Sequence, residues 1–203
     1  MLERFRAFWN ALFSPLADFL IKIGVKPDHV TYVGTLGVSV GALWLFPQGE
    51  FFWGTMFVTA FVFSDIVDGT MARKMGTSSK WGAFLDSTLD RIGDAAVFGG
   101  IALWYAWEGD SPLYLGLSLA CLVLGNLTSY ARARAEALGM EAKGGIAERS
   151  DRLVSILVMT GLAGLFDLMI LQHVTLWALA AASLVTVVQR MAMVHRQAVG
   201  KPL

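Results

Sequence analysis

Two runs of residues with regularly spaced aspartates decide how this chain folds. Residues 65–73 read Asp-Ile-Val-Asp-Gly-Thr-Met-Ala-Arg, and residues 82–90 read Gly-Ala-Phe-Leu-Asp-Ser-Thr-Leu-Asp. Apolar segments lie on both sides of these runs, and burying a carboxylate near a bilayer costs several kcal/mol. Because four unpaired carboxylates would not be tolerated there, we expect them to be neutralised, most simply by divalent metal.

The composition indicates an integral membrane protein built from helices. Of the 203 residues, 56% are hydrophobic and 16% are charged, whereas a soluble domain has about 25% charged residues. Several windows approach ~20 mostly apolar residues, the length that spans a bilayer as a helix. The predicted fold class is all-α and membrane-integral, with residues 1–203 forming a single domain. Cys121 is the only cysteine, which excludes an internal disulfide.

Six transmembrane helices are predicted after an N-terminal amphipathic helix at residues 2–22. We expect the amphipathic helix to lie in the membrane interface, with Pro15 kinking or breaking it. Its apolar positions recur at helical spacing, at Phe5, Phe8, Trp9, Leu12, Phe13, Leu16, Phe19 and Leu20. The six-helix bundle occupies residues 28–197, with spans at residues 30–46, 51–72, 81–107, 113–135, 153–170 and 175–195.

The basic residues predict the orientation of these spans. In this arrangement all 16 Lys and Arg residues lie on one side of the membrane. The links on the other side, at residues 47–50, 108–112 and 171–173, contain none. Since Lys and Arg accumulate in cytoplasmic loops, both termini and the aspartate runs are expected on the cytoplasmic side of the cell membrane.

The four aspartates are spaced to form a metal site. Asp65 and Asp68 lie three residues apart on one helix, and Asp86 and Asp90 lie four apart on the next, so each pair shares a helix face. Oxygen ligands from two helices suit a hard cation, which predicts Mg²⁺ or Mn²⁺, with two ions expected. The structural alternative is that these acids form ion pairs with arginines or cap the ends of spans.

Small residues beside the aspartates predict that a bulky ligand approaches the two helices. Gly69 follows Asp68 directly, and Gly82 precedes Asp86 by one helical turn. Glycine inside a helix costs ~1 kcal/mol relative to alanine, but its bare backbone lets a ligand come close. Arg73 is placed where a guanidinium could hold a phosphate. Together these features predict a diphosphate site at the depth of the lipid headgroups.

The same residues resemble the signature of the CDP-alcohol phosphotransferase family. That signature is Asp-x2-Asp-Gly-x2-Ala-Arg-x8-Gly-x3-Asp-x3-Asp, and its fixed positions match Asp65, Asp68, Gly69, Ala72, Arg73, Gly82, Asp86 and Asp90. The six-helix layout with an amphipathic N-terminal helix is also similar to that family. The resemblance implies an enzyme that transfers a substituted phosphate from a CDP-linked lipid to an alcohol and releases CMP. It further suggests a homodimer.

The predicted reaction assigns roles to these residues. The acceptor hydroxyl would attack the phosphorus on the lipid side of the diphosphate while metals stabilise the developing charge. Asp90 is predicted to be the catalytic base, as the resemblance supports, and to contribute to the metal site of Asp65, Asp68 and Asp86. Asp94, one turn further, is expected to support the site or pack. The predicted CDP-lipid contacts are Asp28, Thr31, Gly69, Arg73, Ser79 and Gly82.

Arginines near the cytoplasmic ends of the last three spans predict an acceptor that carries a phosphate. Residues 129–136 and 144–153 resemble stretches of the bacterial phosphatidylinositol-phosphate synthases of this family. That likeness implies CDP-diacylglycerol as donor, inositol 1-phosphate as acceptor and phosphatidylinositol phosphate as product. By the same likeness the acceptor phosphate would be held by Ser129, Arg132, Arg152 and Arg190. The alternative explanation for these arginines is positive-inside topology and contact with anionic lipids.

The sequence is also consistent with another acceptor and with another class of protein. Glycerol 3-phosphate is the second candidate acceptor, and it would make the enzyme a phosphatidylglycerol-phosphate synthase. A cation transporter is the main rival class, because acids inside a membrane are common in ion pathways. No nucleic-acid partner is expected. A stripe of small residues at Gly34, Gly37 and Gly41 could mediate helix contacts within one chain or between two copies.

Overall fold

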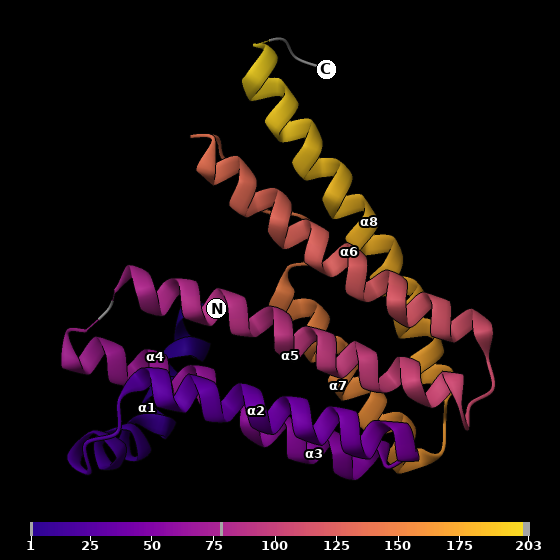
Figure 1. Ribbon diagram of the computed structural model, residues 1–203, viewed down its shortest axis with the longest axis horizontal. Coiled ribbons are helices and arrows are strands. Elements are labelled where there is room, and N and C mark those ends of the chain that lie inside the picture. Colours follow the sequence, from indigo (N-terminus) through magenta and orange to yellow (C-terminus); the bar gives the residue numbers. More distant parts are fainter. Residues whose placement is uncertain (1, 78, 201–203) are drawn as a thin grey trace.

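The computed structural model describes residues 2–77 and 79–200, with side chains from residue 12 onward, as helices joined by short connections (Figure 1). The prediction of an all-α fold is confirmed for these residues. In chain order the helices are α1 (Leu2–Lys22), α2 (Pro27–Leu45), the 3-10 helix η1 (Phe46–Gln48), α3 (Phe51–Val62), α4 (Ser64–Met75), α5 (Lys80–Ala106), α6 (Pro112–Ala137), α7 (Arg149–Phe166) and α8 (Ile170–Val199).

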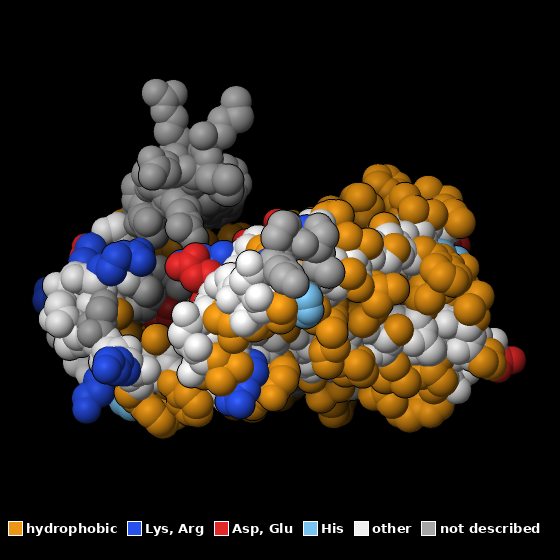
Figure 2. Space-filling view, turned by 90° about the horizontal axis from the view of Figure 1, so that it is seen from above, with side chains coloured by type: hydrophobic (Ala, Val, Ile, Leu, Met, Phe, Trp, Pro, Cys, Tyr) orange, Lys and Arg blue, Asp and Glu red, His pale blue; other side chains and the backbone are white. Residues whose placement is uncertain are grey.

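Within the described residues, four helical segments are long and apolar enough to cross a membrane. They are Pro27–Gln48, Phe51–Met75, Pro112–Ala137 and Ile170–Val199. In α5 and α7, where two more spans were predicted, charged residues lie among the apolar ones: α5 contains Lys80, Asp86, Asp90, Arg91 and Asp94, and α7 contains Arg149, Asp151 and Arg152. Figure 2 shows hydrophobic side chains over much of one face of the molecule, whereas acidic side chains lie in a hollow towards one end, near several Lys and Arg side chains. This distribution supports a multi-pass membrane protein with its polar site near one surface.

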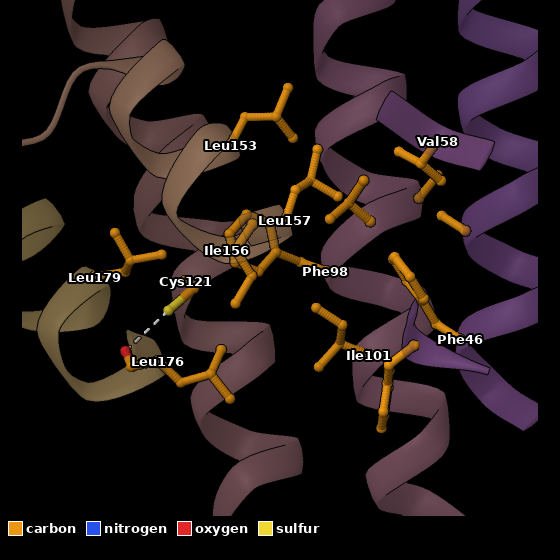
Figure 3. Close-up of a cluster of buried hydrophobic side chains, with 14 of the residues drawn as sticks. Phe46, Val58, Phe98, Ile101, Cys121, Leu153, Ile156, Leu157, Leu176 and Leu179 are labelled. Atoms are coloured by element: carbon orange, nitrogen blue, oxygen red, sulfur yellow. Dashed lines mark hydrogen bonds between the residues drawn. The ribbon is translucent and has the colours of Figure 1, made fainter. Parts of the chain in front are cut away.

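Six helices close into a ring around one apolar core. Helices α2, α5, α6, α8, α7 and α3 contact one another in that order, and α3 contacts α2 again. Every helix of the ring contributes buried side chains to the centre, including Val58 of α3, Phe98 of α5, Cys121 of α6, Ile156 of α7 and Leu176 of α8 (Figure 3). The closed ring therefore holds the polar ends of α5, α6, α7 and α8 in defined positions relative to one another.

The second predicted span is two helices rather than one. Helix α3 ends at Val62 and α4 begins at Ser64, with a turn at Phe63 between them. The Phe63 carbonyl accepts hydrogen bonds from the amides of Ile66 and Val67 at 3.1 and 3.4 Å. The apolar pattern continues across Phe63, which is why the sequence predicts a single span here.

The predicted link at residues 171–173 is wrong, because these residues belong to α8. Helix α7 ends earlier than predicted, at Phe166. Asp167 adopts a left-handed backbone with φ of 55°, which ends the helix. The connection between α7 and α8 is therefore residues 167–169, earlier in the chain than predicted, and the sequence pattern misplaces it because apolar residues continue on both sides.

Helix α1 packs on α4 through a second, smaller apolar cluster. Ala17 is fully buried against Val67 and Met71 of α4. At the edge of this contact, Lys74 Nζ of α4 lies 2.6 Å from Asp18 Oδ1. The first helix is thus attached to the element that carries the first two aspartates of the signature.

The free side of α1 is apolar where its side chains are described. Leu12, Leu16 and Phe19 are exposed, as expected for a helix that lies in a membrane interface. The side chains of Phe5, Phe8 and Trp9 lie outside the described residues. The predicted break at Pro15 is wrong: α1 continues through it as one helix, since a proline removes one backbone donor without removing the other bonds of the helix.

The small residues of α2 allow close contacts within the chain. A Cβ atom added to Gly34 would lie 1.8 Å from Ser64 Oγ, and one added to Gly37 would lie 2.2 Å from the ring of Phe61. Gly41 is similarly crowded by an aromatic ring of α3. The sequence left open whether these glycines mediate contacts within one chain or between two copies. In the structure they bring α2 against α3 and α4 of the same chain.

Candidate active site

Three of the four signature aspartates converge. One carboxylate oxygen from each of Asp65, Asp86 and Asp90 can be chosen so that all lie within 4.8 Å of one another. Carboxylates at such distances repel one another unless a cation lies among them, and an all-oxygen donor set suits Mg²⁺ or Mn²⁺. The residues present therefore fit the divalent metal expected from the sequence.

Asp68 is buried beside this group rather than inside it. Its side chain points towards α2, where Thr31 Oγ1 donates a hydrogen bond of 2.6 Å to Asp68 Oδ2. Asp68 nevertheless lines the same cavity as Asp65 and Asp86. The fourth aspartate is thus oriented by a residue that the sequence places among the CDP-lipid contacts.

A cavity of about 570 Å³ opens between the start of α2, helix α4 and the start of α5. Five of the six residues predicted to contact the CDP-lipid line it, namely Asp28, Thr31, Gly69, Ser79 and Gly82. The sixth, Arg73, lies at its edge: Arg73 Nη1 would be 3.5 Å from a Cβ added to Gly69, and Nη2 is 3.0 Å from Thr70 Oγ1. The predicted donor residues therefore surround one cavity, which is large enough for a small-molecule headgroup.

The two signature glycines face open space in this cavity. Among the side chains that the structure describes, a Cβ on Gly69 would meet only Arg73 Nη1 within 4 Å, and a Cβ on Gly82 would meet only Ser79 Oγ, each at 3.5 Å. Neither glycine is required by helix packing, in contrast to Gly34. A side chain at either position would instead occupy the cavity, which agrees with the interpretation that a ligand approaches the backbone here.

Hydrogen bonds between helices define the rim of the cavity. Ser79 caps α5, because its hydroxyl accepts a hydrogen bond from the Gly82 amide at 3.0 Å. Asp28, near the start of α2, accepts a hydrogen bond of 3.1 Å from the indole N–H of Trp81. The beginnings of α2 and α5 are thereby tied together on either side of the space that a ligand would enter.

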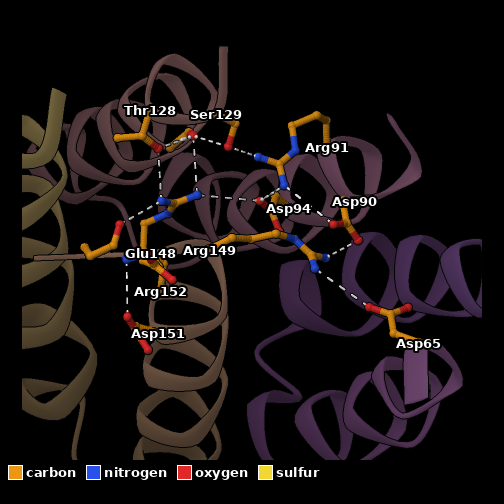
Figure 4. Close-up of polar contacts among 12 residues, drawn as sticks. Asp65, Asp90, Arg91, Asp94, Thr128, Ser129, Glu148, Arg149, Asp151 and Arg152 are labelled. Atoms are coloured by element: carbon orange, nitrogen blue, oxygen red, sulfur yellow. Dashed lines mark hydrogen bonds and ion pairs between the residues drawn. The ribbon is translucent and has the colours of Figure 1, made fainter. Parts of the chain in front are cut away.

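An arginine that the sequence did not assign to the site reaches the acidic cluster from α7 (Figure 4). Arg149 Nη2 lies 2.7 Å from Asp90 Oδ1, Nη1 lies 3.7 Å from Asp65 Oδ2, and Nε lies 3.4 Å from Asp94 Oδ1. Arg149 is the first residue of α7. A signal was present in the sequence, because helix N-termini favour acidic side chains and an arginine there needs partners elsewhere.

Asp94 is the centre of an arginine cluster behind the acids. Its carboxylate lies 3.6 Å from Arg91, 3.4 Å from Arg149 and 3.9 Å from Arg152, and its side chain is 8% exposed. The buried carboxylate is compensated by these three guanidinium groups, and Asp90, which lies 3.8 Å from Arg91 and 2.7 Å from Arg149, supplies a second negative charge to them. Asp94 thus supports the site from behind.

Three of the predicted acceptor residues meet around the end of α6. Arg152 is 2% exposed and donates to the Gly125 carbonyl and to Thr128 Oγ1, at 3.3 and 3.1 Å. Arg190 of α8 donates to the Thr128 carbonyl, and Ser129 Oγ donates to the Gly125 carbonyl at 3.3 Å. These side chains are held by backbone carbonyls of one helical turn, so they are arranged before any ligand binds.

Arg132, the fourth predicted acceptor residue, faces outward. It is exposed and pairs with Glu136 on the same helix, with 2.9 Å between Nε and Oε1. An exposed pair of this kind contributes ~0.3–0.5 kcal/mol, so its side chain is free to exchange partners at little cost. Its predicted contact with the acceptor requires such an exchange.

Arg91 connects the two groups of residues. Its guanidinium donates to Ser129 Oγ and lies 3.8 Å from Asp90 Oδ2. On its other side, Asp90 belongs to the metal-fitting group with Asp65 and Asp86. The predicted donor site and the predicted acceptor site are therefore contiguous, and Asp90 lies where they meet.

Comparison with known proteins decides the family. Residues 25–188 match the model of the CDP-alcohol phosphatidyltransferase family. The chain belongs to this family. Among its members, the phosphatidylinositol phosphate synthase of Streptomyces avermitilis is 50% identical over 204 residues, covering 97% of this chain and 84% of that protein. The enzyme of the same name from Cutibacterium acnes is 49% identical, covering 97% of this chain and 98% of that protein.

Two solved structures of a family member are also similar. A crystal structure of Mycobacterium tuberculosis phosphatidylinositol phosphate synthase with CDP-DAG bound has a TM-score of 0.86 and 40% identity, covering 91% of this chain and 94% of that one. A structure of the same enzyme with manganese and citrate has a TM-score of 0.84 and 43% identity, covering 89% and 88%.

Proposed function

We propose that this chain is a phosphatidylinositol phosphate synthase. It transfers the phosphatidyl group of CDP-diacylglycerol to inositol 1-phosphate, forming phosphatidylinositol phosphate and releasing CMP. Family membership, the names of relatives about half identical, and the CDP-DAG bound to the M. tuberculosis enzyme support this reaction. The observation that carries the proposal is the contact of both predicted subsites with Asp90, through Asp65 and Asp86 on one side and through Arg91 and Ser129 on the other.

The donor headgroup occupies the 570 Å³ cavity in this proposal. The bare backbone at Gly69 and Gly82 admits the diphosphate close to α4 and α5, and Arg73 approaches it from the edge. Asp28, Thr31 and Ser79 line the wall towards α2 and the start of α5, where they face the nucleotide. The acyl chains of the donor remain in the bilayer, next to the apolar outer face of the helix bundle.

Asp65, Asp86 and Asp90 would hold divalent metal, with Asp68 completing the donor set from the cavity wall. Bound ions of this kind supply charge neutralisation at the attacked phosphoryl group and at the departing CMP. The manganese in the related M. tuberculosis structure supports this use of the cluster. Two ions, Mg²⁺ or Mn²⁺, are our proposal for this chain.

Asp90 accepts the proton of the acceptor hydroxyl as that oxygen attacks phosphorus. A base must lie within hydrogen-bond reach of the proton it removes, and Asp90 is the aspartate that contacts both subsites. Arg152, Arg190 and Ser129 bind the acceptor phosphate, and Arg132 joins them when it leaves Glu136. Because backbone carbonyls already orient Arg152 and Arg190, the acceptor binds to groups arranged in advance.

The ring of helices defines how the protein lies in the membrane. We place α5 and α7 across the bilayer together with the four apolar segments, because they complete the closed ring, and this gives six spans. Helix α1 lies in the interface with Leu16 and Phe19 towards lipid, and the acidic cluster and both termini are cytoplasmic. A homodimer is the assembly state we propose from family likeness, and light scattering of the purified protein tests it.

An acceptor panel on purified protein tests the proposed function. CDP-diacylglycerol is supplied with Mg²⁺ or Mn²⁺ and one acceptor at a time, and CMP release is measured. We expect turnover with inositol 1-phosphate and its loss on complete chelation. Turnover with glycerol 3-phosphate alone would indicate the second acceptor. Cation flux in vesicles without CMP release would indicate a transporter.

A further inference from the structure

Asp90 is held by an arginine that is not part of the family signature. Its Oδ1 atom lies 2.7 Å from Arg149 Nη2, a distance typical of a charge-assisted hydrogen bond. The Oδ2 atom has a looser neighbour, Arg91 at 3.8 Å. One oxygen of Asp90 is therefore anchored, and the other is directed by that anchor.

Arg149 lies at a helix end that is fixed by hydrogen bonds. Arg149 begins α7, and a capping box formed by Glu148 and Asp151 fixes this end of the helix. Its Nε lies 3.4 Å from Asp94, which two further arginines surround. Beside Asp90 and Arg149 is a cavity of about 20 Å³, room for a single water molecule. The guanidinium is thus held by three carboxylates, those of Asp65, Asp90 and Asp94, while its side chain stays 28% exposed.

We propose that Arg149 is a positioning residue for the transfer reaction. By holding Asp90 Oδ1, its guanidinium aims Oδ2 towards the acceptor hydroxyl and fixes Asp90 relative to Asp65, to which it also extends. This inference rests on the proposed function of Asp90 as the base. Arg149 touches neither substrate; it acts through the carboxylate that does.

The test compares Arg149→Gln and Arg149→Lys with the wild type in the CMP-release assay at saturating Mn²⁺. A misplacement of about 1 Å costs on the order of 100-fold in rate, so we expect kcat to fall about 100-fold in Arg149→Gln. Lysine keeps the charge but lacks the planar fork, and it should restore part of the loss. Both KM values and the directly measured Kd for CDP-diacylglycerol should stay within about 3-fold. Arg134→Gln, which removes an exposed arginine from the end of α6, is the control and should match wild type.

Three results would overturn this inference. An increase of about 10-fold or more in the KM for inositol 1-phosphate at unchanged kcat would make Arg149 an acceptor ligand. A similar rise in the Kd for CDP-diacylglycerol would make it a donor ligand. An unchanged kcat at saturating metal, with less Mn²⁺ needed, would make it a counter-ion only. Wild-type protein that turns over no substrate would instead refute the proposed function, so the two failures are distinguishable.

Discussion

The Thr31 hydroxyl donates a 2.6 Å hydrogen bond to Asp68 Oδ2 and so connects α2 to the signature helix α4. Asp68 is 7% exposed, so this bond stabilises a carboxylate that has little access to water. Bonds of this kind, one step away from a metal site, orient the groups that bind the ion. The position of Asp68 therefore depends on a residue outside the signature.

Thr31→Val should weaken metal use without unfolding the protein. Valine keeps the shape of threonine but cannot donate to Asp68. Loss of such a supporting bond typically reduces metal affinity or activity by roughly 10–100-fold, so the Mn²⁺ concentration for half-maximal CMP release should rise. Thr55→Val is the control, because Thr55 is buried in α3 and bonds to the Leu157 carbonyl instead. Equal metal requirements in the two variants would contradict a role for Thr31.

Gly69→Ala should make the protein slightly more stable and a poorer enzyme. Alanine is favoured over glycine in a helix by ~1 kcal/mol, and its Cβ meets no closer atom than Arg73 Nη1 at 3.5 Å. That methyl group would, however, occupy the cavity and raise the KM for CDP-diacylglycerol about 10-fold or more. Gly116→Ala in α6, with open space around its Cβ, should gain stability and keep its KM. An unchanged KM in Gly69→Ala would show that the donor does not approach this backbone.

Sequence spacing predicted most of the helices and the convergence of Asp65, Asp86 and Asp90. Asp65 and Asp68, like Asp86 and Asp90, are close because helical geometry places them on one face. Which oxygens converge depends on how each helix is rotated about its axis, and packing in the ring decides that. Asp68 consequently turns towards Thr31, while the other three aspartates meet.

The contacts of Arg149 and Asp94 could not be predicted in the same way. They join α5 to α7, which are distant in sequence, and no local pattern states which helices become neighbours. The turn at Phe63 escaped prediction for a related reason, because the apolar pattern of α3 runs into α4 without interruption. The local signals that did exist were Arg149 at a helix N-terminus and a string of glycines in α2 where α3 and α4 approach.

Asp90→Asn should nearly abolish turnover and leave CDP-lipid binding largely intact. Asparagine keeps the size of the side chain but cannot accept the hydroxyl proton, and a general base contributes about 10²–10⁴-fold to rate. The measurements are CMP release and the Kd for CDP-diacylglycerol. Asp110→Asn, in the connection between α5 and α6, removes a carboxylate outside the site and is the control; it should match wild type. If Asp90→Asn instead abolishes CDP-lipid binding, the main role of Asp90 is that of a metal ligand.

Arg152 is a predicted acceptor residue that also supports the fold. Its guanidinium donates to the carbonyls of Gly125 and Ala147 and to Thr128 Oγ1, and it lies 3.9 Å from Asp94. Arg152→Ala should raise the KM for inositol 1-phosphate more than that for CDP-diacylglycerol. It also leaves a buried carboxylate with one arginine fewer, which can cost about 3–5 kcal/mol, so the variant can fail for lack of stability.

Arg152→Lys resolves that ambiguity. Lysine retains the charge near Asp94 but cannot reach all three hydrogen-bond acceptors, so we expect a loss of about 1–3 kcal/mol in the free energy of unfolding. A protein that stays folded can then be assayed, and its KM for inositol 1-phosphate should rise several-fold more than its KM for CDP-diacylglycerol. Arg134→Lys, at an exposed position of α6, should change neither value. Equal changes for both substrates in Arg152→Lys would count against a separate phosphate pocket, because a residue that only supports the fold has no reason to distinguish the acceptor from the donor.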